Sequence, residues 1–192
     1  MNQSHLTQPE QGQLLRIARS SVQHGITQGQ ALSVEPKDFS LSLQEHGAAF
    51  VTLEKQKQLR GCIGTVEANR PLVVDVSKNA WNAAFRDPRF GPVIQSEFAQ
   101  INIEISILTK AKPLIFTSED DLKLQLQPGS DGLILSDGFK RGLFLPSVWE
   151  KLPEIDVFLS HLKQKAGLPA NYWSDSIQVE RFHSFKFSDD EY

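Results

Sequence analysis

The residues with the clearest chemical potential lie in one short stretch, Leu59-Arg60-Gly61-Cys62-Ile63-Gly64-Thr65. Cys62 is the only cysteine of the chain and follows Arg60 by two residues. Because residues two apart in an extended strand point to the same face, we expect the Arg60 guanidinium near the Cys62 sulfur. A cation beside a thiol favours the thiolate, which is the nucleophilic form. The stretch therefore predicts a reactive thiol, with Cys62 and Arg60 as candidate catalytic residues.

Two glycines flank this cysteine, and a structural explanation of the stretch stays open beside the chemical one. Gly61 and Gly64 leave room for a ligand or another backbone to come close, which makes them, with Thr65, candidate binding residues. Equally, a free cysteine is often simply buried, and a glycine within a strand often marks a bulge or a tight crossing. For a single cysteine the structural explanation is the commoner one.

A second group of charged residues is Arg86-Asp87-Pro88-Arg89-Phe90. Arg86 and Arg89 are candidate binding residues, because two guanidinium groups can hold a carboxylate or a phosphate through paired hydrogen bonds. The alternative is that Asp87 pairs with one of the arginines. Such a surface ion pair contributes only about 0–1 kcal/mol to stability.

Glu104 and His183 complete the set of candidate binding residues. Glu104 lies on the polar side of an alternating segment, residues 99–108, and faces either a cleft or plain water. His183 shares with Arg181 an otherwise apolar side of a last strand, residues 177–187, so it either binds a ligand or turns into solvent at the strand end. His183 or His46 could also serve as the base for a Cys62 nucleophile if the fold brings either one close.

Composition places the chain among soluble globular proteins, with 40% hydrophobic and 22% charged residues. The formal net charge is −3, so nucleic acid is not an expected partner. Nucleic-acid binding through a local arginine patch is therefore the weakest of the functional alternatives. A single cysteine can form no internal disulfide, which fits the reducing cytoplasm. No signal peptide features stand at the N-terminus, and no apolar run approaches the ~20 residues of a membrane span. We therefore expect a cytoplasmic protein without a membrane segment.

The sequence lacks the usual signatures of metal and cofactor binding. Its five histidines are scattered, and no Cys-x-x-Cys or His-x-x-x-His pair occurs. The phosphate-binding Walker loop, the Gly-x-Gly-x-x-Gly dinucleotide motif and the Gly-x-Ser-x-Gly hydrolase motif are also absent. Neither a metal site nor a cofactor is predicted.

Hairpins mixed with helices favour an α+β fold with a mainly antiparallel sheet flanked by helices. The apolar spacing predicts a helix from Pro9 to Gly25 and another from Pro71 to a point before Pro88. We read residues 1–8 as a disordered tail and residues 1–192 as one domain. The remaining predicted elements are a hairpin of strands 48–53 and 59–66, strand 99–108, a short helix from Ser118, a hairpin around Asp137-Gly138, a helix after Pro153 that stops at Gly167, and strand 177–187.

Taken in order, these blocks resemble the AMMECR domain family, whose prokaryotic members are called AmmeMemoRadiSam system protein A. The Arg-Gly-Cys-Ile-Gly core is the most specific of them, and together the blocks span residues 10–187. They are Ala49-Phe50-Val51-Thr52-Leu53, Leu59-Arg60-Gly61-Cys62-Ile63-Gly64, Ala84-Phe85-Arg86-Asp87-Pro88-Arg89-Phe90, Glu104-Ile105-Ser106-Ile107-Leu108-Thr109, Pro128-Gly129-Ser130-Asp131-Gly132-Leu133, Phe144-Leu145-Pro146-Ser147-Val148, and Lys165-Ala166-Gly167-Leu168-Pro169 with Trp173.

The resemblance implies two unequal lobes with a cleft between them, and association with a Memo-like dioxygenase homologue and a radical SAM protein. It brings no established reaction. We therefore carry two hypotheses. In the first, the chain is an enzyme or enzyme component in which Cys62 lies in a cleft and acts on a small or modified-residue substrate. In the second, it is a non-catalytic scaffold that docks on a partner enzyme.

Overall fold

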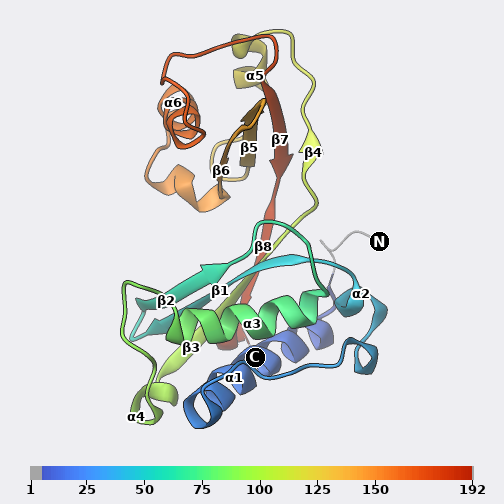
Figure 1. Cartoon of the computed structure of the whole chain (residues 1–192), viewed down its shortest axis with the longest axis vertical. Helices are drawn as coiled ribbons and strands as arrows, with labels where there is room; N and C mark the ends of the chain where they lie inside the picture. Colours follow the sequence, from blue (N-terminus) through green and yellow to red (C-terminus); the bar gives the residue numbers. More distant parts are fainter. Residues whose placement is uncertain (1–5, 192) are drawn as a thin grey trace. The chain divides into compact units, whose positions relative to one another are not determined.

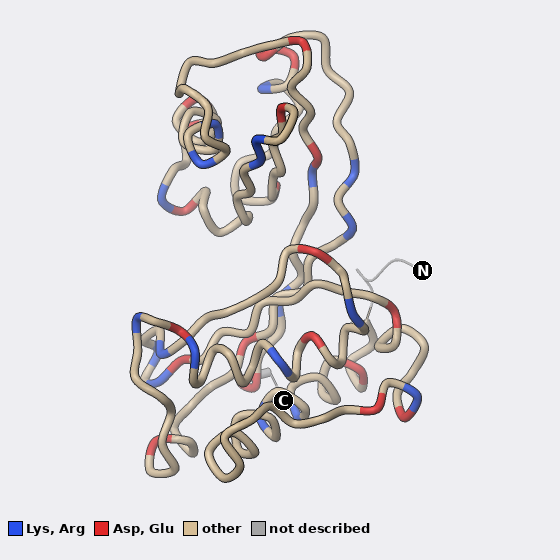
Figure 2. Tube along the Cα trace, viewed as in Figure 1, with Lys and Arg blue, Asp and Glu red and all other residues tan. Residues whose placement is uncertain are grey.

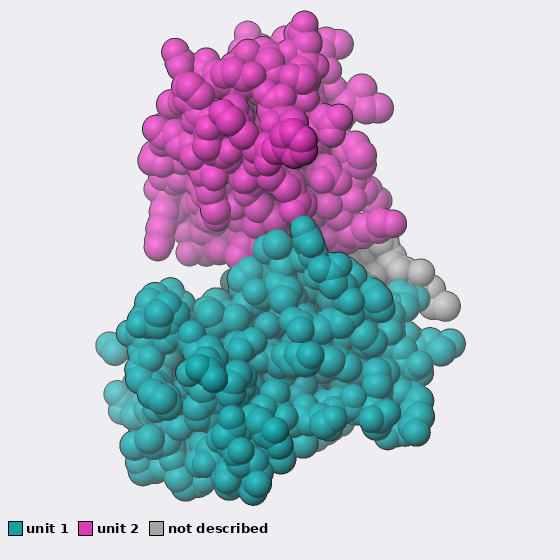
Figure 3. Space-filling view, viewed as in Figure 1, with its two compact units in different colours: residues 1–108, 185–192 teal, residues 109–184 magenta. Residues whose placement is uncertain are grey.

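Apolar side chains gather into two separate cores, each against its own four-stranded sheet. The structure, a computed structural model, describes residues 6–191. The first compact unit comprises Met1–Leu108 and Phe185–Tyr192, and the second comprises Thr109–Ser184 (Figure 3). The strand orders are β2-β1-β3-β8 and β4-β7-β5-β6. This arrangement confirms the predicted α+β fold built on antiparallel strand pairs.

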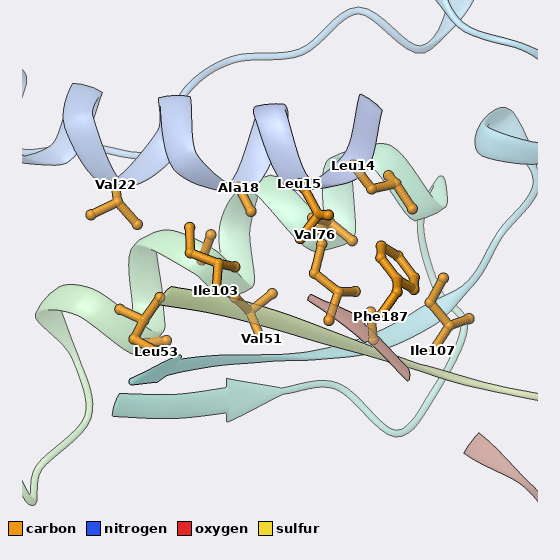
Figure 4. Packing of buried hydrophobic residues seen from close by; sticks show 14 of the residues in the cluster. Leu14, Leu15, Ala18, Val22, Val51, Leu53, Val76, Ile103, Ile107 and Phe187 are labelled. Carbon is orange, nitrogen blue, oxygen red and sulfur yellow. The ribbon is translucent and has the colours of Figure 1, made fainter. Parts of the chain in front are cut away.

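The first unit stacks two long helices on one face of its sheet, as Figure 1 shows. Alternate residues of the strands point at these helices, and Figure 4 shows Val51 and Ile103 packed beneath Ala18 of α1 and Val76 of α3. The elements are α1 (Gln8–Gln28), α2 (Leu41–Gln44), β1 (Ala48–Lys55), β2 (Gln58–Gly64), α3 (Leu72–Phe85), α4 (Gln95–Phe98), β3 (Ile101–Leu108) and β8 (Ser184–Ser188), with short 3-10 helices at Pro36–Asp38 and Asp189–Glu191. The predicted hairpin and the alternating strand before Thr109 are both confirmed.

Helix α1 differs from its prediction at both ends. It runs through Gly25 and ends at Gln28, where Gly29 adopts a left-handed conformation with φ 72°. Gly25 is a packing residue rather than a stop, because a Cβ there would lie 2.2 Å from the Phe85 ring. At the other end, Leu6 is buried in the core and Thr7 caps the helix, so these two residues are not a loose tail; residues 1–5 lie outside the described part.

The predicted last strand is two strands that belong to different sheets. β7 (Gln178–Phe182) pairs with β5 in the second unit, whereas β8 lies beside β3 in the first unit. The break falls at His183. Alternation of side chains indicates which residues share a face, but it does not indicate which strand is the partner. The sequence pattern therefore does not predict this change of sheet.

A stacked aromatic pair lies in the core of the second unit. Trp149 stacks on Phe158 with ring centroids 3.6 Å apart, and its Nε1 donates to the Asp131 carbonyl oxygen at 2.7 Å. Ser118 accepts a hydrogen bond from the Asp121 N–H, which confirms the predicted helix cap. The elements are β4 (Lys112–Pro113), α5 (Glu119–Gln125), β5 (Gly132–Asp137), β6 (Lys140–Phe144), a 3-10 helix at Pro146–Glu150, α6 (Ile155–Lys165) and β7.

Charged residues of both signs are distributed over each unit, as Figure 2 shows. Among residues 6–191, no helix combines the length and the apolar composition needed to cross a bilayer.

The contact of β2 with α3 generates a stability prediction. A Cβ at Gly61 would lie 2.1 Å from the Ala83 carbonyl oxygen, so Gly61→Ala must push the strand away from the helix. We expect a loss of about 2 kcal/mol or more in the free energy of unfolding, measured by urea denaturation. Gly91→Ala is the matched control, because a Cβ there meets nothing within 4 Å. Equal stability of the two variants would contradict the tight contact.

Candidate functional site

Strand β2 has a β-bulge at Arg60, two residues before Cys62. Cys62 lies opposite Thr52 and Gly61 opposite Leu53, but Leu59 lies opposite Glu54, so Arg60 is an extra residue on β2. A bulge interrupts the two-residue alternation of a strand. The contact that the structure shows for the Arg60 guanidinium is with Glu97, in the segment that follows α3.

The Arg60 guanidinium forms an ion pair with Glu97 at the start of α4. Its Nη2 lies 2.6 Å from Oε1 and its Nε 3.2 Å from Oε2, and Lys55 Nζ also reaches Oε2 at 3.2 Å. The Arg60 and Glu97 side chains are 16% and 12% exposed. Hydrogen bonds from Arg60, and further ones from the Ile94 N–H and Lys55, lower the pKa of Glu97 to about 2. Arg60 thus ties the β1–β2 hairpin to the segment that follows α3.

The backbone of Cys62 is held by the neighbouring pair Asp87 and Arg89. The Cys62 N–H donates to Asp87 Oδ2 at 2.8 Å, and Arg89 Nη2 donates to the Cys62 carbonyl oxygen at 3.3 Å. Arg89 also binds Asp87 through Nη2 at 2.7 Å and Nε at 2.9 Å. These bonds hold the pKa of the buried Asp87 well below its usual range. Because β2 is an edge strand, the pair occupies backbone groups that another chain would otherwise bind.

The two arginines of this loop therefore have different partners. Arg89 pairs with Asp87, which is the alternative to anion binding raised by the sequence. Arg86 lies over the Trp81 ring, with its guanidinium carbon 5.2 Å from the ring centroid. Arg89 therefore forms an internal ion pair, and Arg86 packs against the Trp81 ring of α3.

The Cys62 side chain is half-buried on the face of the sheet opposite α1 and α3. The Thr52 hydroxyl donates to its sulfur, with Oγ1 and Sγ 3.4 Å apart. The nearby cation is Arg89, whose Nη2 donates to the Cys62 carbonyl oxygen and whose pKa is raised chiefly by the hydrogen bond to Asp87. Arg89 is therefore the arginine that the structure shows in contact with Cys62.

Polar side chains continue across the sheet from Cys62. Thr52 lies opposite both Cys62 on β2 and Glu104 on β3, and Glu104 Oε1 lies 3.3 Å from Lys186 Nζ on β8. We call these four residues the polar row. The Glu104 and Lys186 side chains are 32% and 51% exposed, so a molecule in solvent can reach both.

Gly64 and Thr65 have packing partners within the first unit. The Phe50 ring lies against Gly64, where a Cβ would be 2.2 Å from a ring carbon. Thr65 Oγ1 donates to Asp75 Oδ2 at 2.6 Å. Asp75 is fully buried on α3 and also accepts the Arg70 Nε at 2.7 Å. Both residues therefore fasten the end of β2 to its surroundings.

His183 belongs to the second unit and meets a buried carboxylate there. Its Nε2 lies 3.2 Å from Asp131 Oδ1, and Arg181 Nη1 lies 3.6 Å from Asp131 Oδ2. Asp131 is fully buried and also accepts the Gln127 N–H at 2.7 Å. The unusual basic pair on the last strand is thus explained by an acidic partner from the turn before β5.

Sequence reasoning missed several residues that shape these contacts, among them Thr52, Glu97 and Asp131. The sequence near Thr52 and Glu97 does not predict their partners. The partner of Thr52 depends on the register of the strands, and that of Glu97 depends on the path of the loop after α3. Asp131 could have been suspected, since a basic pair on an apolar face requires a counter-charge. Among residues 6–191, no three histidine, cysteine or acidic side chains are grouped so as to hold a metal ion.

The lowered pKa of Glu97 makes stability depend on pH. The carboxylate is stabilised in the folded state, so its contribution is complete above the ordinary glutamate pKa of 4.5 and is lost as pH falls toward about 2. That contribution is at most about 3 kcal/mol. Glu97→Gln should therefore show a smaller fall in unfolding free energy than the wild type over this range, measured by urea denaturation. The exposed Glu35→Gln serves as control and should parallel the wild type; a parallel curve for Glu97→Gln would refute the assignment.

Comparison with known proteins places this architecture in a family. The AMMECR1 family profile matches residues 15–187. A protein of Methanothermobacter thermautotrophicus is 35% identical over 192 residues, covering 99% of this chain and 100% of that protein. A protein of Methanopyrus kandleri is 36% identical, covering 95% and 90%.

A solved structure agrees with these sequence matches. An uncharacterized protein from Pyrococcus horikoshii has a TM-score of 0.76 and 34% sequence identity, covering 92% of this chain and 90% of that one. The identity and the coverage are both high enough to show common descent and not only a shared fold. This chain belongs to the AMMECR1 family.

Proposed function

We propose that the chain is an enzyme or enzyme component in which the Cys62 thiol reacts with a small or modified-residue substrate. One observation carries the proposal: Thr52 donates a hydrogen bond to the sulfur, and the Arg89 guanidinium donates to the carbonyl oxygen of the same residue at 3.3 Å. A donor and a cation both favour the thiolate over the thiol. Cys62 is half-buried, so part of the residue is exposed to solvent.

The polar row supplies contacts for a substrate beside this thiol. Glu104 and Lys186 carry opposite charges on the same face as Thr52, and both are partly exposed. A substrate that bears an ammonium and a carboxylate group can bind each of them in place of their mutual ion pair. This arrangement supports a substrate of amino acid or peptide character.

The family resemblance supplies the proposed partners. It implies a Memo-like dioxygenase homologue and a radical SAM protein, as the name AmmeMemoRadiSam system protein A records. The free Cys62 thiol fits the reducing conditions of the cytoplasm, where we place the protein. In this proposal the chain carries or modifies a substrate that the two partner proteins also process.

A scaffold role is the second candidate, and the motif itself favours it. Arg60 binds Glu97, Gly61 meets the Ala83 backbone, and Gly64 meets the Phe50 ring. Packing therefore accounts for three residues of the motif without any reaction. In this case the first unit is a rigid module that docks on one of the partner enzymes, and Cys62 is only part of its sheet.

The thiol proposal predicts faster alkylation of Cys62 than of a cysteine in a short peptide at about pH 7, measured with iodoacetamide and mass spectrometry. Arg89→Gln should slow the reaction about threefold, because it removes the cation beside the sulfur. Arg86→Gln is the matched control from the same loop, since Arg86 contacts Trp81 instead. Thr52→Val should also slow alkylation.

Two outcomes would count against a primed thiol: a wild-type rate equal to that of the peptide, or equal rates for the two arginine variants. The scaffold alternative is tested separately with Cys62→Ser. Cells that depend on the protein should lose its function if the thiol reacts, and should keep it if the chain only docks. Co-purification of the Memo-like and radical SAM proteins with Cys62→Ser would show that docking itself survives.

A further inference from the structure

The second unit contains a pocket of about 670 Å³ that the proposed function does not use. It lies between residues 113–117, which include the end of β4, and residues 173–180, which run into β7. The two segments are hydrogen-bonded at Leu114, whose N–H donates to the Val179 carbonyl oxygen at 2.8 Å. A volume of this size matches the pockets that hold small ligands.

Apolar and aromatic side chains line much of this pocket. Ile177 and Val179 belong to the buried core of the unit, and Phe116 and Trp173 pack against that core. The Phe116 and Trp173 rings are 5.8 Å apart between centroids and tilted by 55°. The pocket therefore offers a ligand two aromatic rings at the edge of an apolar core.

All the charge in the lining is negative. Asp175 and Glu180 are the charged residues among those that line the pocket, and no lysine or arginine is among them. Within residues 6–191, neither carboxylate forms a hydrogen bond or an ion pair. Glu180 is half-buried, so its charge is less screened by water than that of an exposed carboxylate. The two carboxylates of the pocket thus have no positive partner among these described residues, and a bound cationic ligand can supply one.

Trp173 already binds one cation. Lys163 Nζ lies 5.6 Å from the centre of the ring, and the same ammonium is 2.7 Å from Glu119 Oε1. Lys163 is almost fully buried and does not line the pocket, and its charge is matched by Glu119. The cation contact of Trp173 is therefore made by Lys163, and the residue contributes an aromatic surface to the pocket.

We propose that this pocket binds an organic cation, namely an alkylammonium group on an apolar chain. The alkyl chain lies against the apolar part of the lining, and the ammonium pairs with Glu180, a carboxylate of the same lining. Such a group occurs both in free amines and in lysine side chains of proteins. The inference concerns the second unit and does not depend on the reactivity of Cys62.

The test compares three probes of the same length on the full-length protein: hexylammonium, hexanol and hexanoate, titrated by calorimetry and followed by the indole signals in NMR spectra. We expect hexylammonium to bind at least about tenfold more tightly than hexanol, and hexanoate to bind most weakly. Glu180→Gln should reduce the preference for the cation about fivefold. Glu150→Gln, an exposed acid outside the pocket, is the matched control and should leave the preference unchanged.

Nα-acetyl-lysine methylamide separates the two sources of the ammonium group. Binding at least as tight as that of hexylammonium assigns the pocket to a lysine side chain, and weaker binding assigns it to a free amine. The inference is overturned if hexylammonium shows no saturable binding, if hexanol binds as tightly, or if Glu180→Gln keeps the full preference. The comparison of probes on the wild-type protein stands even if a variant fails to fold.

Discussion

The close approach of β2 to helix α3 is the constraint on which the first unit depends. At Gly61 the strand comes so near the Ala83 carbonyl oxygen that no side chain fits between them. This contact brings the β1–β2 hairpin against the end of α3, and therefore beside the loop that follows the helix. Asp87 and Arg89 of that loop can then reach the backbone of Cys62. The position of the thiol is thus set by a glycine one residue away.

The charged residues of this region stabilise the same arrangement from two sides. Glu97 forms ion pairs with Arg60 and Lys55, and Asp87 binds Arg89 and accepts a hydrogen bond from the Cys62 N–H. Both carboxylates are largely withdrawn from water, so each needs its partners to remain charged in the folded state. The bulge at Arg60 allows these two acids to bind different residues of one short motif. The motif consequently combines a packing role with a free, half-buried cysteine.

The two units carry separate chemical features. In the first unit, a thiol, a hydroxyl and an ion pair follow one another across a sheet. In the second unit, an aromatic and acidic pocket lies beside β7, and a buried aspartate holds Arg181 and His183. The sequence-based grouping of His183 with Cys62 as a possible base stays a prediction, since the partners that the structure shows for the ring lie in its own unit. Each feature can therefore be tested by itself.

Local patterns in the sequence determined the elements, the α+β class and the family. The isoleucine alternation of β3, the cap at Ser118 and the hairpin that carries Cys62 all depend on neighbouring residues, so the chain alone predicts them. Tertiary structure decided the contacts: the bulge that turns Arg60 to Glu97, the change of sheet at His183, and the passage of α1 through Gly25. Register, loop path and helix packing join residues far apart in the chain, and a periodic pattern records faces without recording partners.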